Sequence, residues 1–191
     1  MKSPALALLF AAACGNPDNL VLGGVAPGPS TPLVLFDNIN SAISATVALK
    51  DASGNPTGQK AATVVISNKS GLCGALAAHP DYFRKPPEAY LALIIFMPPG
   101  YLGTFIIGRG GVDQGAGSEI IATTGAQSTV TPFTVLNGGY IALTNWADNP
   151  GGSATGSFDL AYTHPTLSGA FEFSGRFKTQ VCPALSGALL P

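Results

Sequence analysis

The clearest strand pattern is "LSGAFEFSGRFKTQV", residues 167–181, near the end of the chain. Apolar residues and glycines occupy its odd positions up to Phe177, among them Leu167, Phe171 and Phe173, whereas serine, glutamate, arginine and lysine occupy most even positions. A period of two places one face of a β-strand in a core and the other in water. The stretch therefore predicts a half-buried strand.

Shorter stretches of the same kind precede it, separated by turns rich in glycine and proline. Residues 89–97, "AYLALIIFM", are apolar on both faces, which is typical of a central strand covered on both sides. The pair Asn137-Gly138 predicts a hairpin, because both residues tolerate positive φ. The expected strands lie at 42–50, 62–68, 89–97, 119–124, 128–136, 140–146, 154–163 and 167–181, and residues 98–108 give a turn and another strand.

Eight or nine short strands with turns about every 8–12 residues indicate an all-β fold. We expect a single antiparallel β-sandwich over residues 34–185, with a lipocalin-like β-barrel as the alternative. One short helical segment interrupts the strands near Cys73, where Leu72, Cys73 and Leu76 share one face. Residues 186–191 are expected to form a C-terminal tail.

The beginning of the chain has the pattern of an export signal, which we assign to residues 1–13. Lys2 is followed by nine apolar residues, too few to span a bilayer as a helix, and small residues precede Cys14. The segment resembles the lipobox of bacterial lipoproteins, although Ala11 stands where that family most often has leucine. The resemblance implies lipidation of Cys14 by fatty acyl chains such as palmitate, and ordinary secretion is the alternative.

Residues 14–33 read as a lipidated N-terminus and flexible tether, because they contain several prolines and glycines and no sustained periodicity. Gly15 follows the lipid site, and by resemblance to the known sorting rule this favours delivery to the outer membrane. The implied partner is a membrane, held through the N-terminal lipid.

The cysteine count fits this interpretation. The chain has three cysteines, and lipidation of Cys14 leaves Cys73 and Cys182, which should form one disulfide in an oxidising compartment. Two buried free thiols are the alternative. A zinc site is disfavoured, since neither cysteine has a second Cys or His at ligand spacing.

The C-terminal segment carries a second resemblance. Its elements "GSFDL", "LSGAF" and the closing Cys182 are similar to the C-terminal hairpin of small, uncharacterised bacterial lipoproteins, such as those numerous in myxobacteria. That resemblance implies no activity. It adds support only for the bridge between Cys73 and Cys182.

Composition and motifs disfavour several function classes. Charged residues make up 10% of the chain and the net charge is −1, so there is no basic stripe for nucleic acid. No G-x-S-x-G elbow, H-E-x-x-H motif, Walker loop or EF-hand loop occurs. His79 and His164 each precede a proline and read as turn residues. We therefore expect no catalytic residues, no metal and no cofactor.

The best candidate for binding is the segment "HPDYFRKPPEAY", residues 79–90, a polar and aromatic loop on a rigid β frame. The residues that it offers are His79, Asp81, Tyr82, Arg84, Lys85 and Glu88. The sequence thus predicts a lipid-anchored β-domain of the cell envelope that acts as a binding or structural module. The alternative is a lipocalin-like carrier of an apolar ligand.

Overall fold

Most of the alternating stretch near the C-terminus forms strand β10, Ala170–Lys178, which has a strand on each side in its β-sheet. A computed structural model describes residues 19–25, 38–50, 55–107, 116–122, 131–133, 135–163 and 170–190. Phe173 and Phe177 are buried and Arg176 is exposed, as the period of two requires. The two faces of β10 therefore separate a core from solvent.

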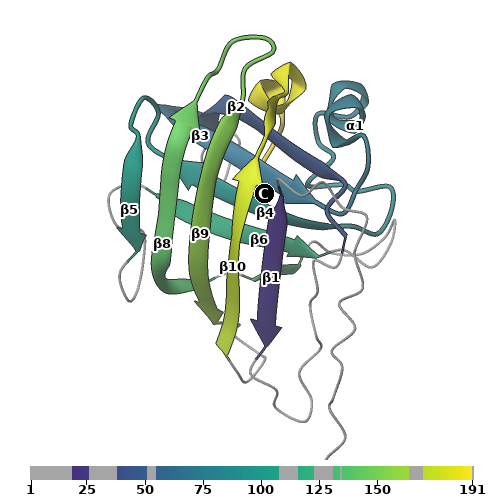
Figure 1. Cartoon of the computed structure of the whole chain (residues 1–191). Coiled ribbons are helices and arrows are strands. Elements are labelled where there is room, and N and C mark those ends of the chain that lie inside the picture. The colour runs from purple at the N-terminus through teal and green to yellow at the C-terminus, as the bar shows by residue number, and fades with distance from the viewer. Residues whose placement is uncertain are drawn as a thin grey trace, which may run out of the picture.

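Five antiparallel strands make up the first sheet, in the order β1-β10-β9-β8-β5 (Figure 1). β9 pairs with β10 over its whole length and places Leu160 opposite Phe173. The bounds of the remaining strands are β1 Leu20–Val25, β9 Ala154–Thr163, β8 Val135–Trp146 and β5 Gly103–Ile107.

Six strands make up the second sheet, in the order β11-β2-β3-β4-β6-β7. All neighbours are antiparallel except β11 and β2, which run parallel. The central strand β4 is buried on both faces, as its continuous apolar sequence predicted. The bounds are β2 Ser41–Lys50, β3 Pro56–Ser67, β4 Leu91–Met97, β6 Gly117–Ala122, β7 Thr131–Phe133 and β11 Gln180–Val181.

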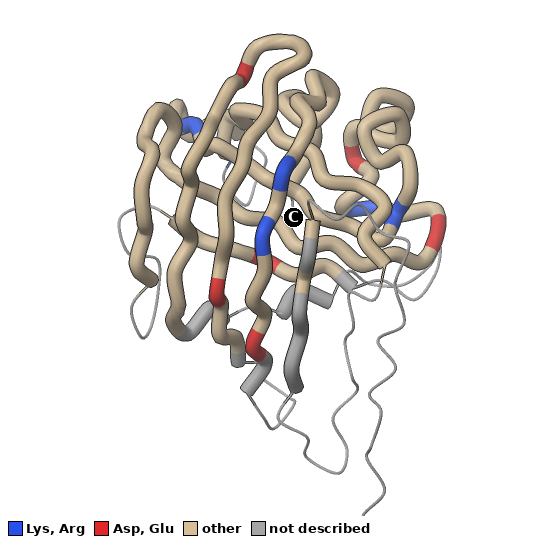
Figure 2. Tube along the Cα trace, in the orientation of Figure 1, with Lys and Arg blue, Asp and Glu red and all other residues tan. Residues whose placement is uncertain are grey.

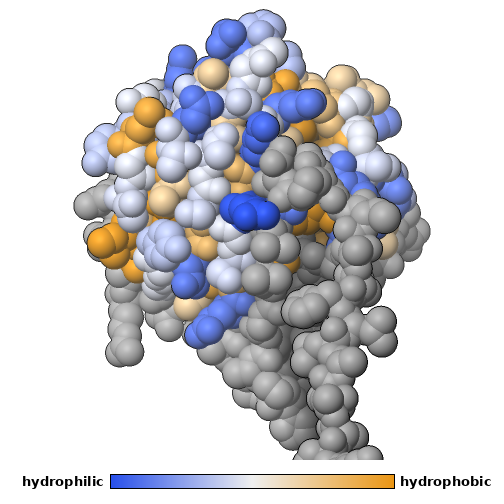
Figure 3. All heavy atoms as spheres, in the orientation of Figure 1, coloured by the Kyte–Doolittle hydropathy of each residue, from blue (hydrophilic) through white to orange (hydrophobic). Residues whose placement is uncertain are grey.

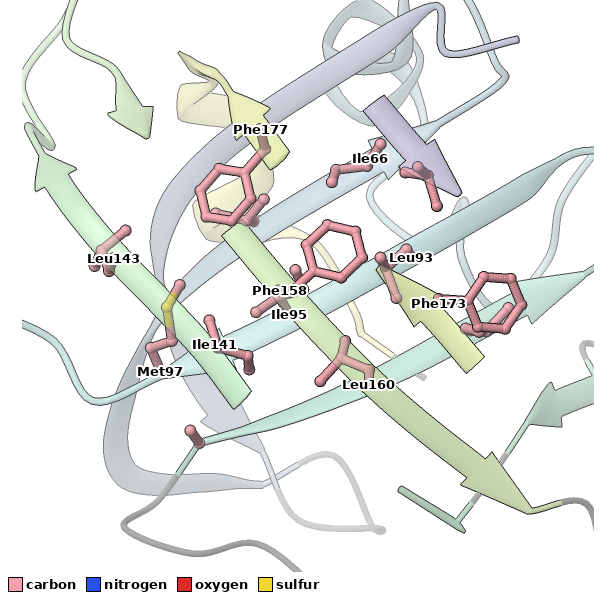
Figure 4. Packing of buried hydrophobic residues seen from close by; sticks show 14 of the residues in the cluster. Ile66, Leu93, Ile95, Met97, Ile141, Leu143, Phe158, Leu160, Phe173 and Phe177 are labelled. Atoms are coloured by element: carbon pink, nitrogen blue, oxygen red, sulfur yellow. The ribbon is translucent and has the colours of Figure 1, made fainter. Parts of the chain in front are cut away.

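The two sheets pack face to face, and their facing side chains form what we call the inter-sheet core (Figure 4). Phe158, Leu160 and Phe173 of the first sheet lie against Leu93 and Ile95 of the second. Burial of such side chains is the main favourable term in folding. Because these side chains fill the space between the sheets, the expected sandwich is confirmed.

A third layer covers the other face of the six-stranded sheet, and we call it the outer layer. It consists of helix α1, Leu72–Ala78, the connection at residues 79–90, and the 3₁₀-helix η1, Pro183–Gly187, with the residues that follow it. Its buried side chains meet those that β2, β3 and β4 direct away from the inter-sheet core, including Ile43, Val65 and Ile94. The predicted helical segment near Cys73 is therefore α1.

A disulfide joins Cys73 of α1 to Cys182, directly before η1, with 5.7 Å between the two Cα atoms and a sequence separation of 109. This confirms the predicted bridge. The alternative of two free thiols is wrong. The bridge ties both helical pieces of the outer layer to each other.

Two of the predictions about the sheets are wrong. The lipocalin-like barrel is not formed, because the described strands make two separate sheets, each with two edges. The hairpin at Asn137-Gly138 is also absent, since β8 runs through both residues with a shift of register between Leu136 and Gly138. Next to this shift of register, a side chain at Gly139 would overlap the carbonyl oxygen of Asp159. This glycine therefore allows β8 and β9 to lie close together and does not form a turn.

The predicted boundaries also change. Leu20–Val25, assigned to the tether, form β1 against the edge of β10, because a free sheet edge orders a segment that has no pattern of its own. The predicted tail is packed, since Ala188 is buried and the N–H of Leu189 donates to the carbonyl of Pro80 at 2.8 Å. The expected strand 128–136 is divided between β7 and β8, which belong to different sheets.

Candidate functional site

The predicted binding loop lies in the outer layer, and Tyr82 holds it there. Tyr82 is buried, its ring centroid lies 5.3 Å from that of Tyr90, and its hydroxyl donates to Glu88 Oε1 at 3.0 Å. Lys69 Nζ lies 2.9 Å from the same carboxylate oxygen. The structure therefore brings Tyr82 and Glu88 together, with Lys69 as a third member that the sequence did not indicate.

This cluster shifts the acidities of its members. The hydrogen bonds from Lys69 and Tyr82 hold the pKa of the Glu88 carboxyl below its ordinary value of 4.5. Burial raises the pKa of the Tyr82 hydroxyl, and the bond to Glu88 raises it further. Both residues therefore keep fixed protonation states at neutral pH, with a neutral tyrosine donating to an ionised carboxylate.

The other four residues of the predicted loop do not converge. Arg84 Nε donates to the carbonyl of Leu190 at 2.8 Å, and Lys85 Nζ lies 3.6 Å from Asp81 Oδ2. His79 is exposed, and its backbone N–H donates to the carbonyl of Ala75 at 2.9 Å at the end of α1. These residues mostly contact each other or other parts of the outer layer, and so they stabilise that layer. Ligand binding by the loop stays a prediction.

A cleft of about 600 Å³ lies beside the disulfide, at the end of the sandwich where β10 passes into β11. Segments far apart in sequence form its walls: Asn19, residues 39–43, residues 71–73, residues 151–153 and residues 178–180. A pocket of this volume is within the range that small-molecule sites in proteins occupy. This cleft is the candidate functional site.

Buried hydrogen bonds hold the wall that connects β10 to β11. The Thr179 hydroxyl donates to Ser44 Oγ at 2.7 Å and accepts from the N–H of Ala154 at 3.0 Å. The N–H of Val181 donates to the carbonyl of Gly152 at 3.1 Å. These bonds join the two sheets at the cleft, so its shape is fixed by buried backbone and hydroxyl groups.

Other parts of the cleft lining are held in the same way. Ser41 Oγ donates to the carbonyl of Lys69 at 2.6 Å and accepts from the N–H of Leu72 at 3.3 Å. Asn19 Oδ1 accepts from the N–H of Lys178 at 2.9 Å. At Gly152 a side chain would overlap the carbonyl of Ala147, so only glycine fits this turn. These parts of the cleft lining therefore depend on small residues, most of them polar.

The chemistry of the lining is that of binding by hydrogen bonds. It offers amides, hydroxyls and backbone groups, and Lys178 is the cation among the lining residues, which include no Asp, Glu or His. Arg176 lies two residues before Lys178 on β10, and Lys and Arg positions are blue in Figure 2. Within the described residues, no three His, Cys, Asp or Glu side chains gather to hold a metal ion. The described lining supplies no general acid-base pair.

Other predicted residues have no described position. Cys14, the proposed lipid site, and His164 lie outside the described residues. No helix in the described part of the chain is long and apolar enough to cross a membrane. Comparison with protein-family models, with curated proteins and with solved structures found no match to this chain.

Proposed function

We propose that the protein is a lipid-anchored module of the bacterial cell envelope that binds a small polar ligand in the cleft. The observation that carries this proposal is the cleft of about 600 Å³, whose lining combines amides, hydroxyls and Lys178 with apolar residues such as Ile43 and Leu72. The disulfide that borders it at Cys73 supports a role in an oxidising compartment. The lipobox-like sequence before Cys14 supports the anchor.

The position of the anchor relative to the cleft adds to this proposal. Asn19 lines the cleft and lies five residues after Cys14. A chain of that length spans at most roughly 18 Å when fully extended. A lipid on Cys14 would therefore keep the cleft near the membrane surface, which favours a ligand that is found in the envelope.

The anchor is tested by fractionation of cells that express the full chain. Cys14→Ala should move the protein from the membrane fraction to the soluble fraction, with wild type as the control. If the variant stays in the membrane fraction while its signal is still removed, the lipid anchor is wrong.

The ligand is tested separately by native mass spectrometry of protein purified from the envelope. We expect a small bound molecule on wild type that is lost in Ser153→Trp, because the indole fills the cleft. Ser157→Trp, on the neighbouring strand β9 and away from the cleft, is the matched control. A bound molecule that survives Ser153→Trp, or its absence from wild type, contradicts binding in the cleft.

A further inference from the structure

Large hydrophobic side chains that are exposed in the described part of the chain gather around one strand. Tyr101, Leu102 and Ile106 are 54%, 54% and 62% exposed, and Tyr140 is 39% exposed. Ile106 of β5 is the register partner of Tyr140 of β8, and Tyr101 packs on Phe105 with 5.1 Å between ring centroids. Figure 3 shows hydrophobic side chains at the margin of the molecule where β5 lies. A concentration of this kind marks an interaction surface.

The strand at the centre of this patch is a sheet edge. β5 pairs with β8 on one side and, within the described residues, with no strand on the other, so a row of backbone N–H and C=O groups faces outward. Edges are usually protected by charges, prolines or bulges. β5, "GTFII", has none of these, whereas the edge strand β7 contains Pro132. The open edge is suited to an added β-strand.

We propose that this strand is β5 of a second copy of the protein, which pairs antiparallel about a two-fold axis. An antiparallel edge is self-complementary under such an axis, because each donor or acceptor meets its counterpart on the other copy. The two five-stranded sheets then join into one continuous sheet. The proposal does not depend on the lipid anchor or on the cleft.

Charge favours a second copy as the occupant. A two-fold axis brings identical residues of the two chains close to one another, and like charges at such positions oppose pairing. β5 and its neighbour β8 contain no charged residue. The symmetric arrangement therefore brings no like charges of β5 and β8 together.

The register and strength of the pairing follow from the strand. When the axis passes through Phe105, Thr104 lies opposite Ile106 of the second copy, and both are exposed on the outer face. The five-residue strand and its few exposed side chains form an interface smaller than the roughly 800 Å² per partner of a standard complex. We therefore expect a dimer that dissociates on dilution.

The first test measures the association of the purified full chain by analytical ultracentrifugation over a wide range of concentration. Wild type should pass from monomer to dimer, and Ile106→Lys should stay monomeric, because pairing would bring two lysines close together. Gln59→Lys, at an exposed strand position of the other sheet, is the matched control and should dimerise like wild type. Circular dichroism checks that both variants fold.

The second test fixes the register. Chains carrying Thr104→Cys and chains carrying Ile106→Cys, mixed in equal amounts and mildly oxidised, should form a covalent dimer. Wild type and either variant alone should form little. A monomer at every concentration, equal dimerisation of Ile106→Lys, or cross-linking that is no greater in the mixture overturns the proposal. A wild-type monomer that instead binds lipid vesicles or a foreign strand through this patch also overturns it.

Discussion

The inter-sheet core and the outer layer lie on opposite faces of the same six-stranded sheet, but different interactions hold them. In the inter-sheet core both sides are strands, so backbone ladders fix side chains such as Phe158 and Leu93 in register. The outer layer packs α1, η1 and an irregular connection on that sheet. It also has a disulfide, the Tyr82–Glu88–Lys69 cluster and the bond from Arg84 to Leu190.

This contrast shows where single side-chain interactions or a disulfide are needed to hold a layer. Strands that share a ladder are held along their whole length, whereas short helices and loops leave many backbone groups without such a ladder. Local stability in proteins follows such differences. We therefore expect the outer layer to open before the sandwich unfolds, and the following predictions test that order.

The largest effect should come from truncating one buried phenylalanine in each region. Phe158→Ala and Phe83→Ala each remove a fully buried ring and should each cost about 3–5 kcal/mol. Hydrogen exchange separates them: Phe158→Ala should lower protection in both sheets, whereas Phe83→Ala should lower it first in α1 and residues 79–90. Uniform loss of protection in both variants would show that the two regions unfold as one unit.

Loss of the disulfide should have the next largest effect. Replacing Cys73 and Cys182 together by alanine should lower the free energy of unfolding by about 2–4 kcal/mol, because the bridge closes a loop of 109 residues. Thermal unfolding of the variant, and of wild type with and without reductant, measures this. Equal melting temperatures in all samples would show that packing alone holds the outer layer.

Removal of one hydroxyl from a buried tyrosine in each region should lower the free energy of unfolding by a smaller amount, and the two variants can be compared directly. The Tyr162 hydroxyl donates to Ser118 Oγ at 2.7 Å between the sheets, and Tyr162→Phe should cost about 1 kcal/mol. Tyr82→Phe should cost less, because the Glu88 side chain is half exposed and retains its ion pair with Lys69. Urea unfolding of both variants measures the difference, and a larger loss in Tyr82→Phe would contradict it.

The pH dependence should separate the same two variants. The folded pKa of Glu88 is lowered, so its contribution is present above the ordinary carboxyl pKa of 4.5 and is lost as the pH falls through the lowered value. Tyr82→Phe removes one cause of that shift and should reduce the loss of stability on acidification. Tyr162→Phe should leave the decrease in stability at acidic pH unchanged. Identical decreases in wild type and Tyr82→Phe would contradict this assignment.

The smallest effect concerns Glu119, which lines a hollow of about 200 Å³ under the outer layer with Lys50 and Arg84. Burial raises the pKa of its carboxyl, so stability is greatest below the ordinary carboxyl pKa and declines as the pH rises through the raised value. Glu119→Gln should therefore be slightly more stable than wild type at neutral pH, with a difference that disappears in acid. Thermal unfolding at both pH values measures it, and a less stable variant at neutral pH would show that the charge has a partner.

The amino-acid sequence alone determined the class of the fold and most of its strands. Alternation is a local property, so residues 170–178 and 42–50 could be identified as strands without knowing their neighbours. The expected end of the first strand at residue 181 was wrong, because residues 180–181 form β11 in the other sheet. The continuous apolar run at 89–97 indicated a strand covered on both faces, and β4 is such a strand. The bridge between Cys73 and Cys182 could also be predicted, because the expected lipidation of Cys14 leaves only these two cysteines.

Only the tertiary structure decided which strand joins which sheet, where the edges lie and where the cleft opens. Leu20–Val25 become a strand because β10 offers an edge, and Asn137-Gly138 continue through β8 because β9 lies against them. Residues 151–153 lie beside Ser41 and Thr179 in the cleft, and no pattern in the sequence indicated this closeness. Such neighbours are set by contacts between segments far apart in the chain, and a local pattern carries no information about them.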